Sequence, residues 1–157
     1  MPHFREQRQG TIINIASVGG RITFPLYSLY HATKWAIKGL TESMQYQLAP
    51  FNVRVKIVEP GPIKTDFYDR SLDVINKPGL TAYDAYTQRV MPNMMPNIKN
   101  AGATAPGPEV VAKVEFRAAT DGCGRLRYSA NSAMFLFLRK LFPDYVFFWV
   151  MRKALKA

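Results

Sequence analysis

The sequence contains very few of the residues from which disulfides and soft-metal sites are built. Its 157 residues include one cysteine, Cys123, and two histidines, His3 and His31. A single cysteine cannot form an internal disulfide, and these three scattered residues do not resemble a cysteine–histidine metal site. We therefore expect no metal centre, and we expect a protein of a reducing compartment.

Long hydrophobic runs are also missing. The longest apolar stretches, 134–138 and 145–151, are far shorter than the roughly 20 residues that a membrane-spanning helix needs. The first ten residues are polar and lack the apolar core of a signal peptide. These features favour a cytoplasmic protein. The apolar content of 48% is too high for a disordered tail, and the length suits one ordinary domain.

Acidic residues are scarce, above all near the C-terminus. The chain has 21 Lys and Arg against 11 Asp and Glu, and residues 125–157 hold seven basic residues and one acidic residue. That stretch also carries eight aromatic residues: Tyr128, Phe135, Phe137, Phe142, Tyr145, Phe147, Phe148 and Trp149. The first interpretation is a pair of helices that buries an aromatic face over the sheet edge and an apolar pocket. The second is shallow contact with a membrane surface. The helical spacing of the aromatics argues against a nucleic-acid partner, and we expect none.

The first half of the chain has the pattern strand, helix, strand. Residues 11–16 are short, β-branched and apolar, which predicts a strand buried on both faces of a parallel sheet. Residues 27–48 lack an internal proline until the end and are rich in helix formers. Residues 53–59 alternate in polarity and stop at Pro60-Gly61, which predicts a second strand. The spacing fits one crossover unit, so the two strands should be parallel.

Two details of this half concern helix ends and faces. A helix over residues 2–9 is expected to end at Gly10. The helix over 27–48 is expected to bury an apolar stripe formed by Leu29, Ala32, Ala36, Leu40 and Met44.

The pattern is weaker after residue 59. We expect, in order, a loop over 60–78 with a helical turn at 66–71, a helix over 81–90, an irregular segment over 91–106, a helix over 108–120, a third strand over 125–129, and helices over 131–141 and 144–155. Prolines and asparagines within 91–106 motivate the irregular segment. The sequence therefore predicts an α/β fold of about three strands in residues 1–129, followed by an amphipathic helical extension over 130–157.

Three residues of the first half are placed to face one crevice. Tyr30 and Lys34 are four residues apart on the predicted helix, so their side chains leave one face a turn apart. Ser17 follows the first predicted strand, at the carboxyl edge where open α/β sheets bind ligands. We therefore expect Ser17 to face the Tyr30–Lys34 pair.

This trio suits proton transfer to or from an alcohol oxygen. A tyrosine hydroxyl with an ordinary pKa of about 10 is a poor base at neutral pH, and a neighbouring ammonium group favours the phenolate. A serine hydroxyl can hold a carbonyl oxygen and share its developing charge. The reaction that needs all three is hydride transfer between a nicotinamide and an alcohol or ketone. The Tyr-x-x-x-Lys spacing is weak alone; the order of strand, Ser, helix, strand and Pro-Gly is the stronger signal.

Three motifs in this order resemble the short-chain dehydrogenase/reductase family: residues 14–20 (NIASVGG), 30–34 (YHATK) and 58–65 (VEPGPIKT). The resemblance is continuous over 2–68 and vaguer to about residue 119. It implies part of a Rossmann-type fold, a doubly wound parallel sheet with flanking helices. It also implies NAD or NADP as cofactor, in oxidised or reduced form, and a homo-oligomer that packs through the Tyr30 helix.

The resemblance further implies a role for each matching residue. Ser17 orients the substrate, Tyr30 is the general acid/base, and Lys34 assists Tyr30 and binds the nicotinamide ribose. The loop that holds the nicotinamide carboxamide and the nearby phosphate is formed by Pro60, Gly61, Ile63 and Thr65. The substrate is a small alcohol or ketone, and the apolar C-terminal region suggests a hydrophobic, lipid-like or steroid-like one.

Several motifs of that family have no counterpart in this sequence. They are the T-G-x-x-x-G-x-G turn, the acidic or basic residue after the second strand that selects the cofactor, the N-N-A-G motif, and the asparagine on the helix before the serine strand. Gly19-Gly20 does not replace the first of them, since no phosphate-binding glycine pattern opens a helix there. We therefore expect the C-terminal half of such a domain. Two hypotheses follow: an oxidoreductase with a Ser-Tyr-Lys site, or a non-catalytic fragment or binding module that cannot bind cofactor alone.

Other conspicuous residues have simpler explanations. His31 follows Tyr30 directly, so on a helix it points about 100° away and is expected to be a surface or packing residue. Cys123 lies between two glycines and is expected in a turn. The methionines within 91–95 are expected to pack flexibly in a loop beside the substrate, not to bind metal.

Overall fold

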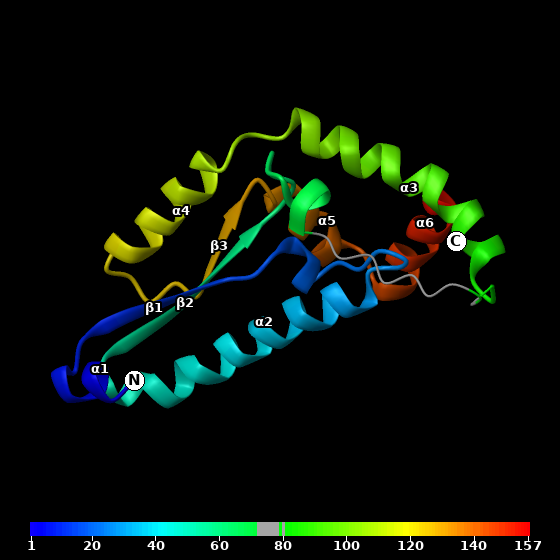
Figure 1. Ribbon diagram of the computed structural model, residues 1–157. Coiled ribbons are helices and arrows are strands. Elements are labelled where there is room, and N and C mark those ends of the chain that lie inside the picture. The colour runs from blue at the N-terminus through cyan, green and yellow to red at the C-terminus, as the bar shows by residue number, and fades with distance from the viewer. Residues whose placement is uncertain (72–78, 80) are drawn as a thin grey trace.

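The fold is a three-stranded parallel sheet between helices (Figure 1). The structure, a computed structural model, describes residues 1–71, 79 and 81–157. The strands β1 (Gly10–Ile15), β2 (Val53–Pro60) and β3 (Arg127–Ala130) are ordered β1-β2-β3. Helices α2 (Ser28–Leu48) and α4 (Glu109–Thr120) cover opposite faces of this sheet. The predicted α/β class is confirmed.

Alternation along the strands explains the two layers of helices. Successive side chains of a strand point to opposite faces. On β1, Ile12 packs with Leu48 in the cluster under α2, whereas Ile13 packs with Ala118 in the cluster under α4. Each helix therefore has its own small apolar core on one side of the sheet.

The predicted strand–helix–strand unit is confirmed within one residue at each strand. β1 and β2 are parallel, in a register that runs from Gly10 opposite Val53 to Ile15 opposite Val58. The prediction that the first strand is buried on both faces is wrong. β1 is half-buried and Ile15 is 43% exposed, because only one edge of β1 is paired in the described sheet. The central strand β2 is the buried one.

The first helix ends differently from the prediction. Helix α1 (Pro2–Gln7) is closed by Arg8, whose φ of 50° is left-handed and whose N–H donates to the Arg5 carbonyl at 3.3 Å. Gly10 is the first residue of β1 instead. A Cβ on Gly10 would lie 2.9 Å from the Phe4 ring, so close packing explains the glycine there.

Most of the apolar stripe predicted for α2 is not its buried face, although Met44 packs against the buried Leu48 and Val53. Leu29 and Leu40 are 66% and 52% exposed. The buried residues of α2 are His31, Thr41 and Leu48. Thr41 can be fully buried because its hydroxyl accepts a hydrogen bond from the Asn14 side chain at 2.9 Å. Polar groups with partners therefore occupy the face that periodicity assigned to solvent.

The irregular segment predicted over 91–106 is wrong for most of its length. Helix α3 (Asp84–Thr104) continues through Pro92 and Pro96. Val90 and Met94 on this helix are almost fully buried against Leu155 of α6 (Asp144–Leu155). Burial of this apolar face outweighs the helix-breaking tendency of the prolines. Met94 is thus a packing residue, as expected, but in a helix.

The remaining elements largely match the sequence. A π-helical turn, η3, covers Phe67–Ser71, and the part of the predicted loop over 72–78 lies outside the described residues. Helix α5 (Ala133–Leu141) follows β3, which begins two residues later than predicted.

The expectation of a buried C-terminal aromatic face is wrong, because six of its eight aromatics are exposed. In the described part of the chain, no helix is long and apolar enough to cross a membrane.

A buried lysine joins the sheet to the end of α4. Lys56 on β2 is 1% exposed, and its Nζ donates to the Asp121 carboxylate at 2.5 Å and to the Ala118 carbonyl at 2.7 Å. The Tyr128 hydroxyl donates to the other Asp121 oxygen at 2.5 Å. The hydrogen bonds from Lys56 and Tyr128 hold the pKa of the Asp121 carboxyl well below its usual value. Burial, and then the hydrogen bond to Asp121, raise the pKa of Tyr128.

This cluster predicts a dependence of stability on acid. Because the pKa of Asp121 is depressed in the folded state, its contribution is fully present above the ordinary aspartate pKa and is lost as the pH falls toward the folded value. Asp121→Asn should lower the urea concentration at the unfolding midpoint at neutral pH. The difference in midpoint between parent and variant should shrink as the pH falls below the ordinary aspartate pKa. The exposed Asp66→Asn is the matched control. Equal midpoints for parent and Asp121→Asn at neutral pH would contradict the prediction.

Candidate active site

The carboxyl ends of β1 and β2 bring two predicted segments to one edge of the sheet. The Ala16 N–H donates to the Val58 carbonyl at 2.9 Å, which carries the pairing one residue beyond β1. Ser17 follows in an extended conformation and begins the short 3-10 turn η1 (Val18–Gly20). The Ser17 Oγ accepts a hydrogen bond from the Gly19 N–H at 3.0 Å. This bond fixes the direction of the serine hydroxyl at the sheet edge.

Tyr30 and Lys34 reach the same place from the first turns of α2. The Tyr30 hydroxyl donates to the Ser17 Oγ at 3.1 Å. The Lys34 Nζ lies 5.7 Å from the centre of the Tyr30 ring. Tyr30 and Lys34 are half-buried, so both side chains stay accessible to a ligand. The structure thus brings together the three residues that the sequence singled out.

The loop after β2 lies at this edge too. The Gly61 N–H donates to the Ala130 carbonyl at 2.8 Å, and a Cβ on Gly61 would overlap the Asn131 carbonyl oxygen. Pro60 is the last residue of β2, and the loop after it carries Ile63, which is half-buried, and Thr65, which is exposed. At its end the Phe67 ring lies 5.7 Å from the Tyr30 ring, centre to centre. The predicted cofactor loop is therefore adjacent to Tyr30 through Phe67.

Sequence reasoning missed the role of Gly19-Gly20 in the site. A Cβ on Gly19 would lie 2.9 Å from the Tyr30 ring, and a Cβ on Gly20 would lie 2.8 Å from the Lys34 carbonyl oxygen. Both glycines are buried. Only residues without a side chain allow this loop to lie directly on the turn of α2 that carries Tyr30 and Lys34. The signal in the sequence was a glycine pair directly after the serine turn.

The two glycines at positions 20 and 39 predict opposite effects on stability. Gly20→Ala should destabilise the fold by about 1 to 3 kcal/mol, because the new methyl group meets backbone that cannot move away. Gly39→Ala, exposed on α2 with nothing within 4 Å, should stabilise it by about 0.5 to 1 kcal/mol. Urea denaturation of the parent and both variants measures the two changes in the free energy of unfolding. Similar effects of the two substitutions would show that the loop does not press on α2.

His31 on α2 forms hydrogen bonds with the segment that follows Ser17. It is 4% exposed, its Nε2 accepts a hydrogen bond from the Phe24 N–H at 2.8 Å, and its Nδ1 lies 2.8 Å from the Gly19 carbonyl oxygen. Because Nε2 accepts, the ring proton is on Nδ1, which donates to Gly19. The expectation of a packing residue is confirmed. His31 holds both ends of the Gly19–Phe24 segment beside Tyr30.

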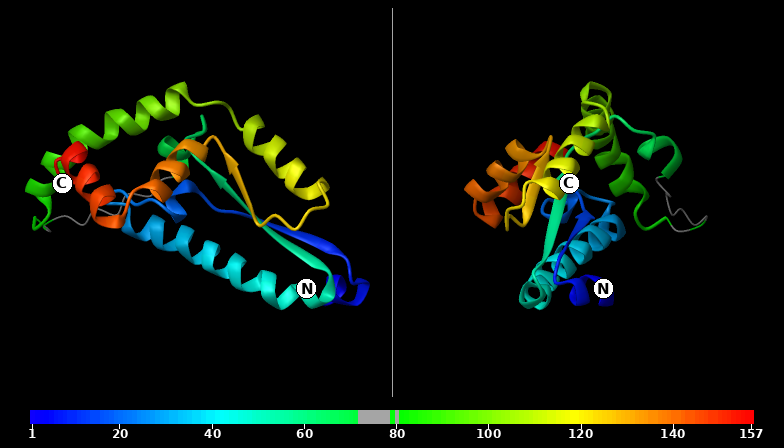
Figure 2. Two further views of the ribbon diagram at one scale, coloured as in Figure 1. Left: turned by 180° about the vertical axis from the view of Figure 1, so that it is seen from behind. Right: turned by 90° about the vertical axis from the view of Figure 1, so that its left-hand side faces the viewer.

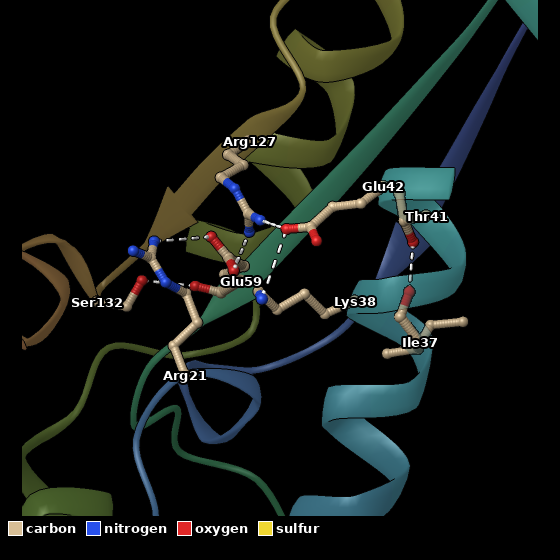
Figure 3. Close-up of polar contacts among 8 residues, drawn as sticks. All are labelled: Arg21, Ile37, Lys38, Thr41, Glu42, Glu59, Arg127 and Ser132. Carbon is tan, nitrogen blue, oxygen red and sulfur yellow. Dashed lines mark hydrogen bonds and ion pairs between the residues drawn. The ribbon is translucent and has the colours of Figure 1, made fainter. Parts of the chain in front are cut away.

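Glu59 is the centre of a second set of contacts behind the site (Figure 3). Its side chain is 2% exposed and accepts a hydrogen bond from Arg127 at 2.7 Å, with Arg21 at 3.8 Å. Arg127 also pairs with Glu42, which pairs with Lys38 on α2 at 3.5 Å. Burial raises the pKa of the Glu59 carboxyl, and the charges of Arg21 and Lys38 oppose that rise. These contacts join β2, β3, α2 and the loop after Ser17.

The immediate surroundings of Tyr30 are aromatic. The Tyr27 ring meets it edge-on with ring centres 6.2 Å apart, and Phe67 lies on it at 5.7 Å. Tyr27 also packs against the Val90–Met94–Leu155 cluster. Burial, and then the nearby Tyr30, raise the pKa of Tyr27. Cys123 is exposed in the connection between α4 and β3, where its N–H donates to the Asp121 carboxylate at 3.1 Å.

Comparison with known proteins agrees with this architecture. A model of the short chain dehydrogenase family matches residues 1–74. Two uncharacterized oxidoreductases of Schizosaccharomyces pombe are 36% identical over 156 residues, which cover 98% of this chain and 63% of each relative. The 17-beta-hydroxysteroid dehydrogenase type 1 of Mus musculus is 31% identical over 134 residues, 84% of this chain and 38% of that protein. The chain thus spans less than two thirds of these relatives.

Solved structures share the fold. A short-chain dehydrogenase from Streptomyces avermitilis superimposes with a TM-score of 0.65 at 25% identity, over 99% of this chain and 54% of that one. A family member from Burkholderia phymatum in complex with NAD gives a TM-score of 0.61 at 23% identity, over 85% and 47%. The sheet is therefore of Rossmann type. The family model over residues 1–74 and the relatives in Schizosaccharomyces pombe and Mus musculus support a member of the short-chain dehydrogenase/reductase family.

Proposed function

We propose that this chain carries the catalytic half-site of an NAD(P)-dependent oxidoreductase that interconverts a hydrophobic alcohol and its carbonyl compound. The observation that carries the proposal is the contact of the Tyr30 hydroxyl with the Ser17 Oγ at 3.1 Å, beside the Lys34 ammonium. The family relationship and the nicotinamide bound in a solved relative support it.

The hydrogen bonds of Ser17 leave its own proton free for a substrate. Its Oγ accepts from the Gly19 N–H and from the Tyr30 hydroxyl, which occupies both lone pairs. The remaining donor is the serine O–H, and it is directed to a group outside this pair. A substrate carbonyl oxygen at that position would receive hydrogen bonds from Ser17 and, after rotation, from Tyr30.

Tyr30 and Lys34 then complete the proton transfer. A bound nicotinamide supplies hydride in reduction and accepts it in oxidation. In reduction, the carbonyl oxygen takes the Tyr30 proton as the carbonyl carbon gains hydride, so the product is a neutral alcohol and Tyr30 is left anionic. The positive charge of Lys34 stabilises that anion, and solvent restores the proton. Oxidation follows the same steps in reverse.

The donor set fits the nicotinamide end of such a cofactor. Lys34 makes no ion pair with any residue that the structure describes, so its ammonium is available to ribose hydroxyls. We assign the carboxamide and adjoining phosphate to Pro60, Gly61, Ile63 and Thr65, whose loop abuts Tyr30 through Phe67. The adenosine end has no glycine-rich turn to receive it in this sequence.

The aromatic surroundings of Tyr30 favour an apolar substrate. Tyr27 and Phe67 flank the tyrosine ring, and neither carries a charge that would bind an ionic substrate.

The exposed stripe of α2 that includes Leu29 and Leu40 is the surface on which we place a second copy of the chain. Sedimentation velocity of the parent and Leu40→Glu tests that assignment, since a dimer through this stripe should dissociate in the variant.

Cofactor binding and turnover of the chain test the proposed function. Titration with NADH and with NADPH should quench protein fluorescence or enhance cofactor fluorescence, and an apolar ketone should then oxidise the bound cofactor faster than pyruvate does. Failure to bind either cofactor would overturn the proposal in favour of a non-catalytic binding module. Binding without oxidation by any apolar ketone would contradict the catalytic assignment of Ser17 and Tyr30.

A further inference from the structure

Helices α5 and α6 lie beyond the carboxyl end of the sheet (Figure 2). Most of their large apolar side chains are exposed among the described residues. α5 buries no residue, and α6 buries only Leu155. From α5 to α6, ten large apolar side chains are at least 39% exposed: Met134, Phe135, Phe137, Leu138, Leu141, Phe142, Tyr145, Phe148, Trp149 and Val150. We call these two helices, the terminal residues Lys156 and Ala157, and Arg89 of α3 beside them the C-terminal surface. A soluble monomer rarely leaves so large an apolar patch open without a binding role.

Two adjoining hollows of opposite character lie on the C-terminal surface. One, of about 870 Å³, is lined mainly by apolar side chains of α6, among them Tyr145, Phe148 and Trp149. The other, of about 480 Å³, is lined by four cations and by Trp149: Arg89, Arg152, Lys153 and Lys156. Trp149 and Arg152 belong to both hollows. An apolar recess therefore opens directly beside a cationic one.

The positive charge of this surface is not neutralised from within. The acidic residue of the last 27 positions, Asp144, pairs with Arg139, which also lies 4.9 Å from the centre of the Phe147 ring. Within the described ranges, Arg152, Lys153 and Lys156 form no ion pair. A ligand for this surface must therefore combine hydrocarbon with negative charge.

We propose that the C-terminal surface binds an anionic lipid bilayer. The exposed aromatics of α5 and α6 enter the boundary between headgroups and acyl chains, and the four cations of the second hollow bind lipid phosphates. Helices of nine and twelve residues lie on such a surface and do not span it. This inference stands on its own residues and does not rest on the proposed function.

Charge and hydrocarbon together favour a bilayer over the other occupants. In a two-fold dimer the same patch meets itself, so the cations around Trp149 would face one another. A soluble phosphate would satisfy the cations and leave the apolar hollow empty. A nucleic acid would do the same, since it offers no hydrocarbon to the exposed Phe and Trp side chains of both helices.

The two tryptophans of the chain allow a direct test. Trp35→Phe leaves Trp149 as the sole indole, and Trp149→Phe leaves Trp35 on α2. Each variant is mixed with vesicles of phosphatidylcholine and phosphatidylglycerol, and with vesicles of phosphatidylcholine alone. We expect a blue-shifted emission from Trp149 with the mixed vesicles only, reversed by high salt, and no shift from Trp35. A shift from Trp35 but not from Trp149 would place the contact elsewhere and overturn the proposal.

Vesicle co-sedimentation of further variants measures the electrostatic and the apolar contributions to membrane binding separately. Arg152→Gln should weaken partitioning into mixed vesicles about fivefold, and Trp149→Ser about tenfold. The matched controls are Lys113→Gln, an exposed residue of α4, and Tyr46→Ser, a residue 75% exposed near the far end of α2. No sedimentation with mixed vesicles at low salt would overturn the inference. So would a parent dimer that Trp149→Ser dissociates, or binding that inorganic phosphate abolishes equally for all variants.

Discussion

Tyr30→Phe is expected to lower turnover of an apolar ketone by about a hundred- to ten-thousand-fold, the range over which a positioned acid or base accelerates proton transfer. The substitution removes only the hydroxyl that donates to Ser17 at 3.1 Å. The ring stays, and so do its contacts with Tyr27 and Phe67. The variant should therefore fold with a loss of about 0.5 to 1.5 kcal/mol at most, the usual worth of one hydrogen bond.

The control for this variant lies on the same helix. Tyr46→Phe removes a hydroxyl from a side chain that is 75% exposed, away from Ser17, and should leave turnover unchanged. Cofactor titration of Tyr30→Phe separates chemistry from binding, because the affinity should stay within a few-fold of the parent. A Tyr30→Phe chain that turns over at the parental rate would remove Tyr30 from the acid/base role.

Arg127→Met is expected to destabilise the fold by about 3 to 5 kcal/mol, the cost of leaving a buried charge without its partner. Glu59 is 2% exposed and receives its short hydrogen bond from Arg127 at 2.7 Å. Without Arg127, Arg21 remains at 3.8 Å and the charge of Lys38 still acts on the carboxylate, but neither replaces that bond. The carboxylate would then be desolvated and poorly compensated.

Two companion variants make this prediction specific. Arg125→Met removes an exposed arginine two residues away and should cost less than about 1 kcal/mol. Glu59→Gln added to Arg127→Met should recover part of the lost stability, because it removes the unpaired charge. Urea unfolding of the four proteins gives the comparison. An equal cost for Arg127→Met and Arg125→Met would contradict the importance of the buried pair.

Local rules were sufficient for the trio at the sheet edge. The four-residue spacing of Tyr30 and Lys34 puts them on one face of any helix, and Ser17 follows a strand whose β-branched composition is visible in the sequence. A parallel crossover then brings the end of that strand to the end of the next one, where Pro60 and Gly61 lie. Each step depends on neighbours in the chain, so the sequence could predict it.

The supporting contacts could not be predicted in this way, because no pattern of spacing or polarity marks the residues that form them. Glu59 and Arg127 are 68 residues apart, and His31 is fixed by Gly19 and Phe24 from another segment. Nothing in the local pattern of VEPG marks its glutamate as a buried charge. The glycines at 19 and 20 become explicable only when α2 is seen to lie against them.

The sequence by itself determined the parallel strand–helix–strand unit and the placing of Ser17 beside Tyr30 and Lys34, because periodicity and short spacings encode them. The family resemblance came from the motifs at 14–20, 30–34 and 58–65. Only the tertiary structure decided which face of α2 is buried, that α3 continues through Pro92 and Pro96, and that the C-terminal aromatics are exposed. The physical reason is the same in each case. Hydrophobicity and local propensity are properties of a residue, whereas burial depends on which partner, apolar or hydrogen-bonding, the fold brings against it.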